Sequence, residues 1–133
     1  MFGSLNDRIV IVSGAGRGIG AAIAQVFARA GAKVMVATRT ASHGEATVGQ
    51  IIKAGGVAAL CEVDIGELAS IERAVSETLG KWGGVDIMVH NAASFLGGPV
   101  EGYTEDDLET VLSVNLKACF RLSKAVIPHF KKR

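Results

Sequence analysis

Residues 13–20 read Ser13-Gly14-Ala15-Gly16-Arg17-Gly18-Ile19-Gly20, and these residues give the strongest indication of the fold. It follows an apolar run at residues 9–12 and opens a segment whose apolar residues recur every three or four positions, as on one face of a helix. A strand, a glycine-rich turn and a helix in this order allow backbone N–H groups to approach a phosphate. The stretch therefore predicts a phosphate-binding turn at the start of a strand–helix unit.

Two glycine spacings fit this turn. Gly16, Gly18 and Ala21 match a GxGxxG/A pattern, whereas Gly14, Gly18 and Gly20 match a GxxxGxG pattern. We prefer the second pattern because it begins directly at the end of the strand. No Lys-Ser or Lys-Thr pair follows the glycines, so a nucleoside-triphosphate P-loop is not expected. A glycine-rich turn without a ligand is the alternative interpretation.

Apolar runs of strand length recur along the chain. They are rich in Val and Ile, do not alternate in polarity, and lie at residues 9–12, 34–37, 57–60 and 85–89. Such runs are typical of strands buried on both faces of a parallel sheet. The segments between them have helical periodicity, which predicts right-handed strand–helix–strand units. We expect an α/β fold with a doubly wound, Rossmann-like parallel sheet, as one unit over residues 1–133 that stops after the fourth strand and a long helix.

Several element ends carry their own signals. Gly31 and the Gly83-Gly84 pair follow helical periods, where a left-handed residue ends a helix. Thr104, with Asp107 three positions later, predicts the start of a short acidic helix. The long helix is expected over residues 115–132, and the fourth strand is expected to form an open apolar edge.

The composition narrows the class of protein. Hydrophobic residues make up 49% of the 133 residues, and 14 Lys and Arg stand against 13 Asp and Glu. This balance gives no field of one sign, so nucleic acid and acidic lipid are not expected as partners. No apolar stretch has the length of a membrane span and no secretory signal is evident, so no membrane association and a cytoplasmic location are expected.

The metal-binding residue types are scattered. Cys61 and Cys119 are isolated, and His43, in a polar loop, His90 and His129 form no cluster. We therefore expect no metal site, and we expect the histidines to be structural or solvated.

Four separated motifs carry a resemblance to a known family. Residues 13–20 resemble TGxxxGIG with Ser in place of Thr, Asp64-Ile65 follows the third apolar run, His90-Asn91-Ala92-Ala93 resembles NNAG, and Asn115 lies in a Ser-Val-Asn-Leu stretch. In this order and spacing the chain resembles the short-chain dehydrogenases/reductases, close to their 3-oxoacyl-acyl-carrier-protein reductase branch. The similarity covers roughly residues 7–133, which correspond to the first half of a family member. His90 and Ala93 depart from the NNAG pattern, which has Asn and Gly at these positions.

The resemblance implies a role for each matching position. Asp64 would bond the adenine edge of a nicotinamide dinucleotide, and Ile65 would pack on the adenine ring. Asn91 and Ala92 would line the ribose side, with the methyl group of Ala93 close to the cofactor. Asn115 resembles the family's catalytic Asn, which holds a water in the proton relay that serves the active-site Lys. Two alternatives stay open, in which Asp64 caps the following helix and Asn115 is a polar residue at a local helix kink. The pyrophosphate would lie on the glycine-rich turn, at Gly14, Gly16, Arg17, Gly18, Ile19 and Gly20.

The end of the second strand bears on the choice of cofactor. In dinucleotide folds a carboxylate about 20 residues beyond the glycines bonds the ribose 2′-hydroxyl of NAD and would repel the 2′-phosphate of NADP. Here the strand ends in Thr38, Arg39 and Thr40, and no acid occurs before Glu45. Arg39 and Arg17 are placed to bracket a 2′-phosphate, to which Arg offers bidentate hydrogen bonds. NADP(H) is therefore expected in preference to NAD(H); the alternative is that both arginines are solvated surface residues.

The function implied is that of an NAD(P)(H)-dependent oxidoreductase, which transfers hydride between nicotinamide and a carbonyl or hydroxyl group of a small-molecule substrate. The family's Ser, and its Tyr with a Lys four residues later, have no counterpart, because Tyr103 is the only tyrosine and Asp107 lies four residues on. We expect a longer parent protein to be active and the 133-residue chain alone to be inactive. The alternative is a nucleotide-binding module without catalysis.

The long helix predicts association. Its apolar residues exceed the roughly 100° stripe that packing on one sheet face requires. The resemblance implies that this helix pairs with its symmetry mate, so a homo-oligomer, either dimer or tetramer, is expected, with Ala118 and Leu122 on the outer face. The alternative is that the extra apolar residues cover another part of the same chain. The apolar residues are Leu112, Leu116, Phe120, Leu122, Ala125, Val126 and Phe130.

Overall fold

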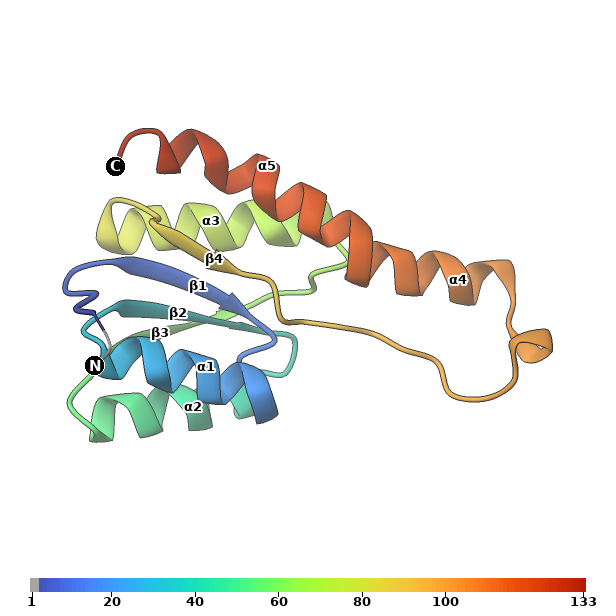
Figure 1. Cartoon of the computed structure of the whole chain (residues 1–133), viewed down its shortest axis with the longest axis horizontal. Helices are drawn as coiled ribbons and strands as arrows, with labels where there is room; N and C mark the ends of the chain where they lie inside the picture. The colour runs from blue at the N-terminus through green and yellow to red at the C-terminus, as the bar shows by residue number, and fades with distance from the viewer. Residues whose placement is uncertain (1–2) are drawn as a thin grey trace.

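The computed structural model describes residues 3–133, in which four parallel strands form one sheet between two layers of helices (Figure 1). The strands are β1 (Ile9–Ser13), β2 (Lys33–Thr38), β3 (Val57–Glu62) and β4 (Ile87–Val89). They lie side by side in the order β3-β2-β1-β4, so β1 has a neighbour on each side. Val10 of β1 lies opposite Val34 of β2 and Ile87 of β4. The doubly wound, Rossmann-like α/β fold predicted from the sequence is confirmed.

Helices cover both faces of the sheet. They are α1 (Gly18–Arg29), α2 (Ala41–Lys53), α3 (Leu68–Trp82), α4 (Glu105–Leu112) and α5 (Ala118–Phe130), with a 3-10 turn at Val100–Gly102. In Figure 1, α1 and α2 lie below the sheet, and α3 and α5 lie above it. Val10 and Val34 pack in the layer of α1 and α2, whereas Ile11 and Met35 pack in the layer of α3 and α5. Successive strand residues are therefore buried on opposite faces, which explains why the strand runs do not alternate in polarity.

Left-handed glycines follow the first three helices. Gly31, Gly55 and Gly83 have φ angles of +98°, +85° and +82° and come after α1, α2 and α3. Gly31 and Gly83 confirm the expectation from the sequence. Gly84 is not left-handed, so one glycine of the pair is enough to end α3.

α4 begins at the predicted capping residue. The Thr104 hydroxyl accepts a hydrogen bond from Asp107 N, and the Asp107 carboxylate accepts one from Thr104 N. These bonds, the backbone one first, hold the pKa of Asp107 below its usual value. α4 continues through a π-helical turn at Ser113–Lys117 into α5, and the two form one long rod that extends past the sheet (Figure 1).

The outer face of α5 differs from the expected one. Ala118 and Leu122, which we expected on the outside, are 0% and 3% exposed and pack in the core with α3. The exposed apolar residues are instead Leu116 and Phe120, at 64% and 70%. The helix carries two apolar stripes, and periodicity alone does not say which one faces the sheet. The stripe that begins with the small side chain of Ala118 lets the helix approach closely, and this is the stripe that is buried.

β4 is shorter than the apolar run that predicted it. The strand begins at Ile87, whereas Val85 precedes the strand and is fully buried. Asp86 N donates to Ile9 O, and the Asp86 carboxylate accepts from Ile9 N at 2.8 Å, so a side chain replaces the first ladder bond. β4 lies at an edge of the sheet, as expected. Within residues 3–133, none of the helices has the length and apolar character needed to cross a bilayer.

Candidate functional site

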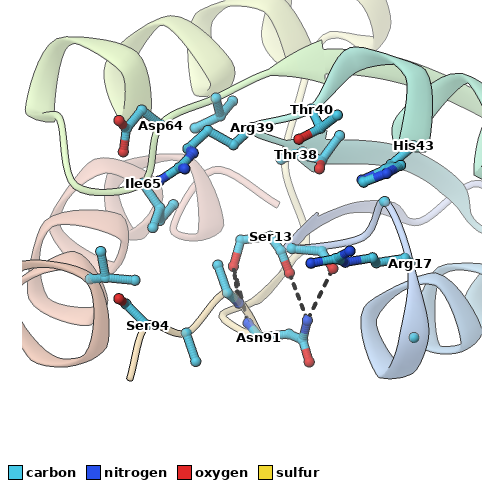
Figure 2. Close-up of a pocket in the computed structure, with 18 of the residues that line it drawn as sticks. Ser13, Arg17, Thr38, Arg39, Thr40, His43, Asp64, Ile65, Asn91 and Ser94 are labelled. Atoms are coloured by element: carbon cyan, nitrogen blue, oxygen red, sulfur yellow. Dashed lines mark hydrogen bonds between the residues drawn. The ribbon is translucent and has the colours of Figure 1, made fainter. Parts of the chain in front are cut away.

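A cleft of about 610 Å³ lies at the carboxyl ends of the strands. It contains the ends of β1 and β4, which are neighbours in the sheet although β2 and β3 separate them in the chain. Ligands of open α/β sheets bind at such a switch in strand order. Figure 2 shows side chains from several separate segments of the chain around this space. The residues that line it are Ser13, Gly14, Gly16, Arg17, Gly18, Ala37, Thr38, Arg39, Thr40, His43, Val63, Asp64, Ile65, Asn91, Ala92, Ala93, Ser94, Phe95 and Val114.

Three glycines shape the turn after β1. Gly14 and Gly18 have left-handed φ angles of +67° and +58°. A Cβ on Gly20 would lie 2.1 Å from the carbonyl oxygen of Gly14, so only glycine allows α1 to start this close to the turn. These three positions form the GxxxGxG pattern, and the geometry therefore supports that spacing over GxGxxG/A.

The turn presents the N-terminus of α1 to the cleft. Arg17 is the N-cap residue, and its side chain makes no capping bond. The first N–H groups of a helix have no partner within the helix and carry the positive end of its dipole. A Cβ on Gly18 would meet no heavy atom within 4 Å, so the backbone is open at this point. The arrangement fits a phosphate group.

Ser13 joins the ends of β1 and β4. Its hydroxyl oxygen accepts hydrogen bonds from Asn91 N at 3.0 Å and Ala92 N at 3.1 Å, and lies 3.2 Å from His90 Nδ1. Two N–H donors fill the acceptor positions of the hydroxyl, so its proton points to His90 Nδ1, which must accept it. The Asn91 side-chain amide donates to the carbonyl oxygens of Ser13 and Gly14, each at 3.2 Å. His90 thus has a structural contact, and Asn91 holds the two strand ends together.

A second wall of the cleft is formed by the end of β2 and the start of α2. Thr38 is 8% exposed, and a Cβ on Gly16 would lie 2.7 Å from Thr38 Oγ1 and 2.8 Å from His43 Cβ. Thr47 Oγ1 donates to Gly16 O at 3.1 Å. The glycine-rich turn and α2 are therefore in direct contact.

The two arginines lie on different sides of the cleft. Figure 2 shows Arg39 extending toward Asp64 and Ile65, whereas Arg17 enters from the glycine-rich turn, on the side of His43. Both arginines are exposed. The side chain that lies on the same side as Arg17 is therefore His43 rather than Arg39.

Asp64 does not cap α3. The N-cap residue of this helix is Glu67, whereas Asp64 Oδ1 accepts a hydrogen bond from Gly66 N at 2.9 Å. Asp64 N donates to Ser70 Oγ, also at 2.9 Å. The alternative that Asp64 is the helix cap is wrong, because the chain makes a further turn before the helix starts. Asp64 and the largely buried Ile65 both line the cleft.

Asn115 binds the loop that follows β4. Its Oδ1 accepts a hydrogen bond from Ser94 N at 2.8 Å, and its Nδ2 donates to Ser94 O at 2.6 Å. Asn115 lies in the π-helical turn, so the alternative of a polar residue at a helix irregularity describes its backbone correctly. Such turns within helices are frequent at functional sites. The amide keeps one N–H and one lone pair for a further partner.

The structure brings together most of the residues predicted to bind a cofactor. Ile19 and Gly20 are the two that do not line the cleft: Ile19 is 75% exposed, and Gly20 is buried behind the turn. His43 was missed, because the sequence analysis placed it in a loop, whereas it lies in the first turn of α2. The start of a helix that follows a parallel strand lies near the carboxyl end of the sheet, and this signal was available. The other lining residues that the sequence analysis did not assign are Ser13, Ala37, Thr40, Val63, Ser94, Phe95 and Val114.

Comparisons with known proteins give the family. The family model for short chain dehydrogenases matches residues 8–133. Galactitol 2-dehydrogenase of Agrobacterium fabrum is 38% identical over 122 residues, which are 92% of this chain and 46% of that protein. Human hydroxysteroid dehydrogenase-like protein 2 is 36% identical over 138 residues, covering 98% of this chain and 33% of that protein. The chain thus spans between a third and a half of the length of these relatives.

Solved structures agree with the fold. A hydroxysteroid dehydrogenase from Escherichia coli superposes with a TM-score of 0.92 at 33% identity, over 97% of this chain and 55% of that one. A metagenomic short-chain oxidoreductase in complex with NADP has a TM-score of 0.89 at 32% identity, over 94% of this chain and 57% of that one. The parallel sheet, with its glycine-rich turn at the switch in strand order, places the chain among the Rossmann-like α/β proteins. Within that class, the chain belongs to the short-chain dehydrogenase family.

Proposed function

We propose that this chain is the cofactor-binding part of an oxidoreductase that prefers NADP(H) to NAD(H) and acts on a carbonyl or alcohol group of a small molecule. The observation that carries the proposal is the wall at the end of β2, where Thr38, Arg39 and Thr40 line the cleft. Asp64, from the loop after β3, is the one carboxylate among the described residues that line it. The position from which an acid would repel a 2′-phosphate is thus free of negative charge.

Different residues of the cleft bind different parts of the cofactor in this proposal. The glycine-rich turn, with the open N–H groups of α1, holds the pyrophosphate, and Arg17 and Arg39 bracket the 2′-phosphate from the two sides of the cleft. Asp64 and Ile65 contact the adenine, and residues 91–93 line the ribose side. When bound, the cofactor supplies the hydride that is exchanged with the substrate.

Asn115 contributes in two ways in this proposal. Its amide fixes Ser94 and thereby positions the loop after β4, which lines the cleft. The N–H and lone pair that remain free hold a water of the proton relay.

The chain alone is proposed to be inactive. The Tyr103 hydroxyl donates to Leu96 O, and Tyr103 does not line the cleft, so it does not act as the proton donor. The second candidate function, nucleotide binding without catalysis, is favoured by this one observation. NADPH oxidation with small carbonyl compounds, measured on a longer parent protein that contains this chain, distinguishes the two. An oxidoreductase turns over, whereas a binding module gives saturable cofactor binding without turnover.

The long helix is proposed to form a contact between copies of the protein. Leu116, Phe120 and Ile127 are 64%, 70% and 46% exposed, and a groove of about 770 Å³ runs between α3 and α5 beside them. Exposed apolar patches of this kind mark association surfaces. A two-fold contact is the commonest arrangement.

Direct binding tests the cofactor proposal. Titration of NADP⁺ and NAD⁺ into the protein, followed by calorimetry, should give a lower Kd for NADP⁺ by about tenfold or more, the effect of one charge-assisted contact. Equal Kd values, or tighter binding of NAD⁺, would contradict the preference. Absence of binding by either cofactor would contradict the proposed function itself.

A further inference from the structure

The start of α2 brings to the cleft one side chain that the proposed function does not use. His43 lines the cleft, and Figure 2 shows its ring beside Thr38, on the side from which Arg17 enters. The ring of His90 is engaged by Ser13, whereas the ring of His43 takes no part in the hydrogen bonds found among residues 3–133. His43 is only half-buried, so its ring can meet a ligand.

Packing of α2 on the glycine-rich turn fixes the position of His43. Thr47, which is 2% exposed, donates from Oγ1 to Gly16 O at 3.1 Å, with His43 O as a second acceptor at 3.4 Å. A Cβ on Gly16 would lie only 2.8 Å from His43 Cβ. His43 therefore cannot leave the turn unless the turn moves with it, and the two are preorganised as one surface.

The charges around His43 favour an anion. The charged groups that line the cleft with it are Arg17 from the glycine-rich turn, Arg39 from the end of β2 and Asp64 from the loop after β3. In Figure 2, Arg39 extends to the side of Asp64, which leaves Arg17 and His43 together at the opposite side. On α2 itself, the exposed Glu45 is the nearest acid in sequence and does not line the cleft. An anion between Arg17 and a charged His43 would relieve their mutual repulsion.

We propose that His43, together with Arg17, determines the affinity for the 2′-phosphate of NADP(H), and that its contribution increases as the pH falls. This inference rests on the proposed function. Histidine is the side chain that ordinarily gains its charge between pH 8 and 5, and a hydrogen bond from a charged donor to phosphate is roughly twice as strong as a neutral one. A phosphate monoester itself loses negative charge near pH 6, which weakens the contacts from the arginines. A preference for NADP that grows with acidity therefore identifies His43 rather than Arg17 or Arg39.

Calorimetric titration of NADP⁺ and NAD⁺ at pH 6 and pH 8 measures this effect without turnover. The quantity of interest is the ratio of the Kd for NAD⁺ to the Kd for NADP⁺. At pH 6, we expect this ratio to be about five- to tenfold lower in His43→Gln than in the wild type, as for the loss of one partly exposed charge-assisted hydrogen bond. At pH 8, the difference should shrink to about twofold or less. His129→Gln, on α5 and outside the cleft, is the matched control and should keep the wild-type ratio at both pH values.

A second variant distinguishes the loss of charge at position 43 from a folding defect. His43→Lys carries a charge at both pH values. The ratio of the Kd for NAD⁺ to the Kd for NADP⁺ should therefore be high at pH 6 and stay high at pH 8, where the ratio of the wild type is lower. Circular dichroism and the melting temperature check that both variants are folded.

The outcomes separate the two proposals. If the wild type binds neither cofactor, the proposed function fails and the role of His43 fails with it. If the wild type prefers NADP⁺ and His43→Gln keeps the wild-type ratio at pH 6 as well as at pH 8, the proposed function stands and the role of His43 is refuted. An equal loss of affinity for NADP⁺ and NAD⁺ also refutes it, because that pattern indicates damage to the glycine-rich turn.

Discussion

Gly20 has no side chain because the carbonyl oxygen of Gly14 occupies the place where one would begin. The ideal Cβ would be 2.1 Å from this oxygen, and the obstacle is backbone rather than a flexible side chain. α1 must therefore start at a fixed distance from the end of β1. The distance between the N-terminus of α1 and the turn therefore depends on the absence of a side chain at Gly20.

Gly20→Ala should lower both stability and cofactor affinity. The added methyl group forces α1 away from the turn, and we expect the free energy of unfolding to fall by about 1–3 kcal/mol, as for overpacking elsewhere. Gly49→Ala is the matched control, since Gly49 lies in α2 with nothing within 4 Å of its Cβ position and should be neutral or stabilised by up to about 1 kcal/mol. Urea unfolding compares the two. Equal stability of the two variants would show that the turn can shift enough to accommodate the added methyl group.

Arg39→Asp should shift the preference from NADP toward NAD. The change removes a cation and places a carboxylate near the end of β2, where it repels a 2′-phosphate and can accept a hydrogen bond from the ribose 2′-hydroxyl. We expect the ratio of Kd values to move toward NAD⁺ by about tenfold or more. Lys132→Asp makes the same change in net charge at an exposed position outside the cleft and should leave the ratio alone. An unchanged ratio in Arg39→Asp would remove this arginine from the 2′-phosphate site.

Individual site residues differ in how far the sequence reveals them. Gly14, Gly18 and Asp64 belong to motifs with a fixed place after a strand, so their position at the cleft could be predicted. His43 belongs to no such motif; its nearness to this edge of the sheet could be predicted from the helix start after the second strand, whereas its contact with Gly16 depends on tertiary packing and could not. Ser94 is similar, since its place depends on the Asn115 amide 21 positions away.

The long helix separates a buried stripe from an exposed one. Ala118, Leu122 and Val126 lie on the sheet side, whereas Leu116 and Phe120 lie outside. Covering such large apolar side chains removes them from water and lowers the free energy of the system. We therefore propose the exposed stripe, rather than the buried one, as the contact between copies of the protein.

Leu116→Glu combined with Phe120→Glu should abolish the proposed association and leave the fold intact. The two carboxylates would face one another across a two-fold contact and would have to lose water there, which costs several kcal/mol. Light scattering measures the mass, and circular dichroism the fold. Val26→Glu, at an exposed apolar position on α1, is the control and should keep the wild-type mass. A double variant with the wild-type mass would show that this stripe is not the contact.

The elements themselves were easier to predict than their orientation. The four strands, the left-handed glycines after α1 and α3, and the Thr104 cap follow from local chemistry that the sequence displays directly. The face of α5 and the late start of β4 do not, because both depend on groups distant in the chain. In β4 the deciding group is Ile9, whose N–H is taken by the Asp86 side chain.

Asp86 ties together three distant parts of the chain. Its carboxylate is 5% exposed and accepts hydrogen bonds from Ile9 N at 2.8 Å, from Arg133 Nε at 2.8 Å and Nη2 at 2.9 Å, and from Arg8 Nη1 at 3.3 Å. The hydrogen bonds from Arg133 are the main reason that the pKa of Asp86 lies below its ordinary value; Ile9 N and Arg8 act in the same direction, and burial opposes them. The segment before β1, the start of β4 and the end of α5 therefore meet at one charge.

Asp86→Asn should lower the free energy of unfolding at neutral pH, and the loss should be smaller at acidic pH. A folded pKa below the unfolded one, which is about 3.9, means that the stabilisation is complete above the unfolded value and is lost as the pH falls through the folded value. We expect Asp86→Asn to lower the free energy of unfolding by about 2 kcal/mol at pH 7, with the difference from the wild type narrowing below about pH 4. Urea unfolding at pH 7, 5 and 3 measures this difference.

Asp7→Asn provides the comparison for Asp86. Its carboxylate is 87% exposed and pairs with Lys33 at 3.3 Å, so the change should cost less than about 0.5 kcal/mol at every pH. Other carboxylates with lowered pKa values, such as Asp107, titrate equally in both proteins and cancel in the difference. A cost for Asp86→Asn that stays constant from pH 7 to pH 3 would contradict the role of its charge.

The place of β4 in the sheet also leads us to expect that it docks after the other strands. β1, β2 and β3 are joined in succession by single helices, whereas the contact of Ser13 with His90 closes a loop of 77 positions, and closure entropy grows with loop length. The amide protons of β4 should therefore exchange with deuterated solvent before those of β1. The end of this strand also supplies Asn91 and Ala92 to the cleft, so the cleft exists only in molecules in which the strand has docked. A ligand bound in the cleft therefore stabilises the docked state and slows hydrogen exchange at the amides of β4. The extent of this slowing measures the affinity for the ligand.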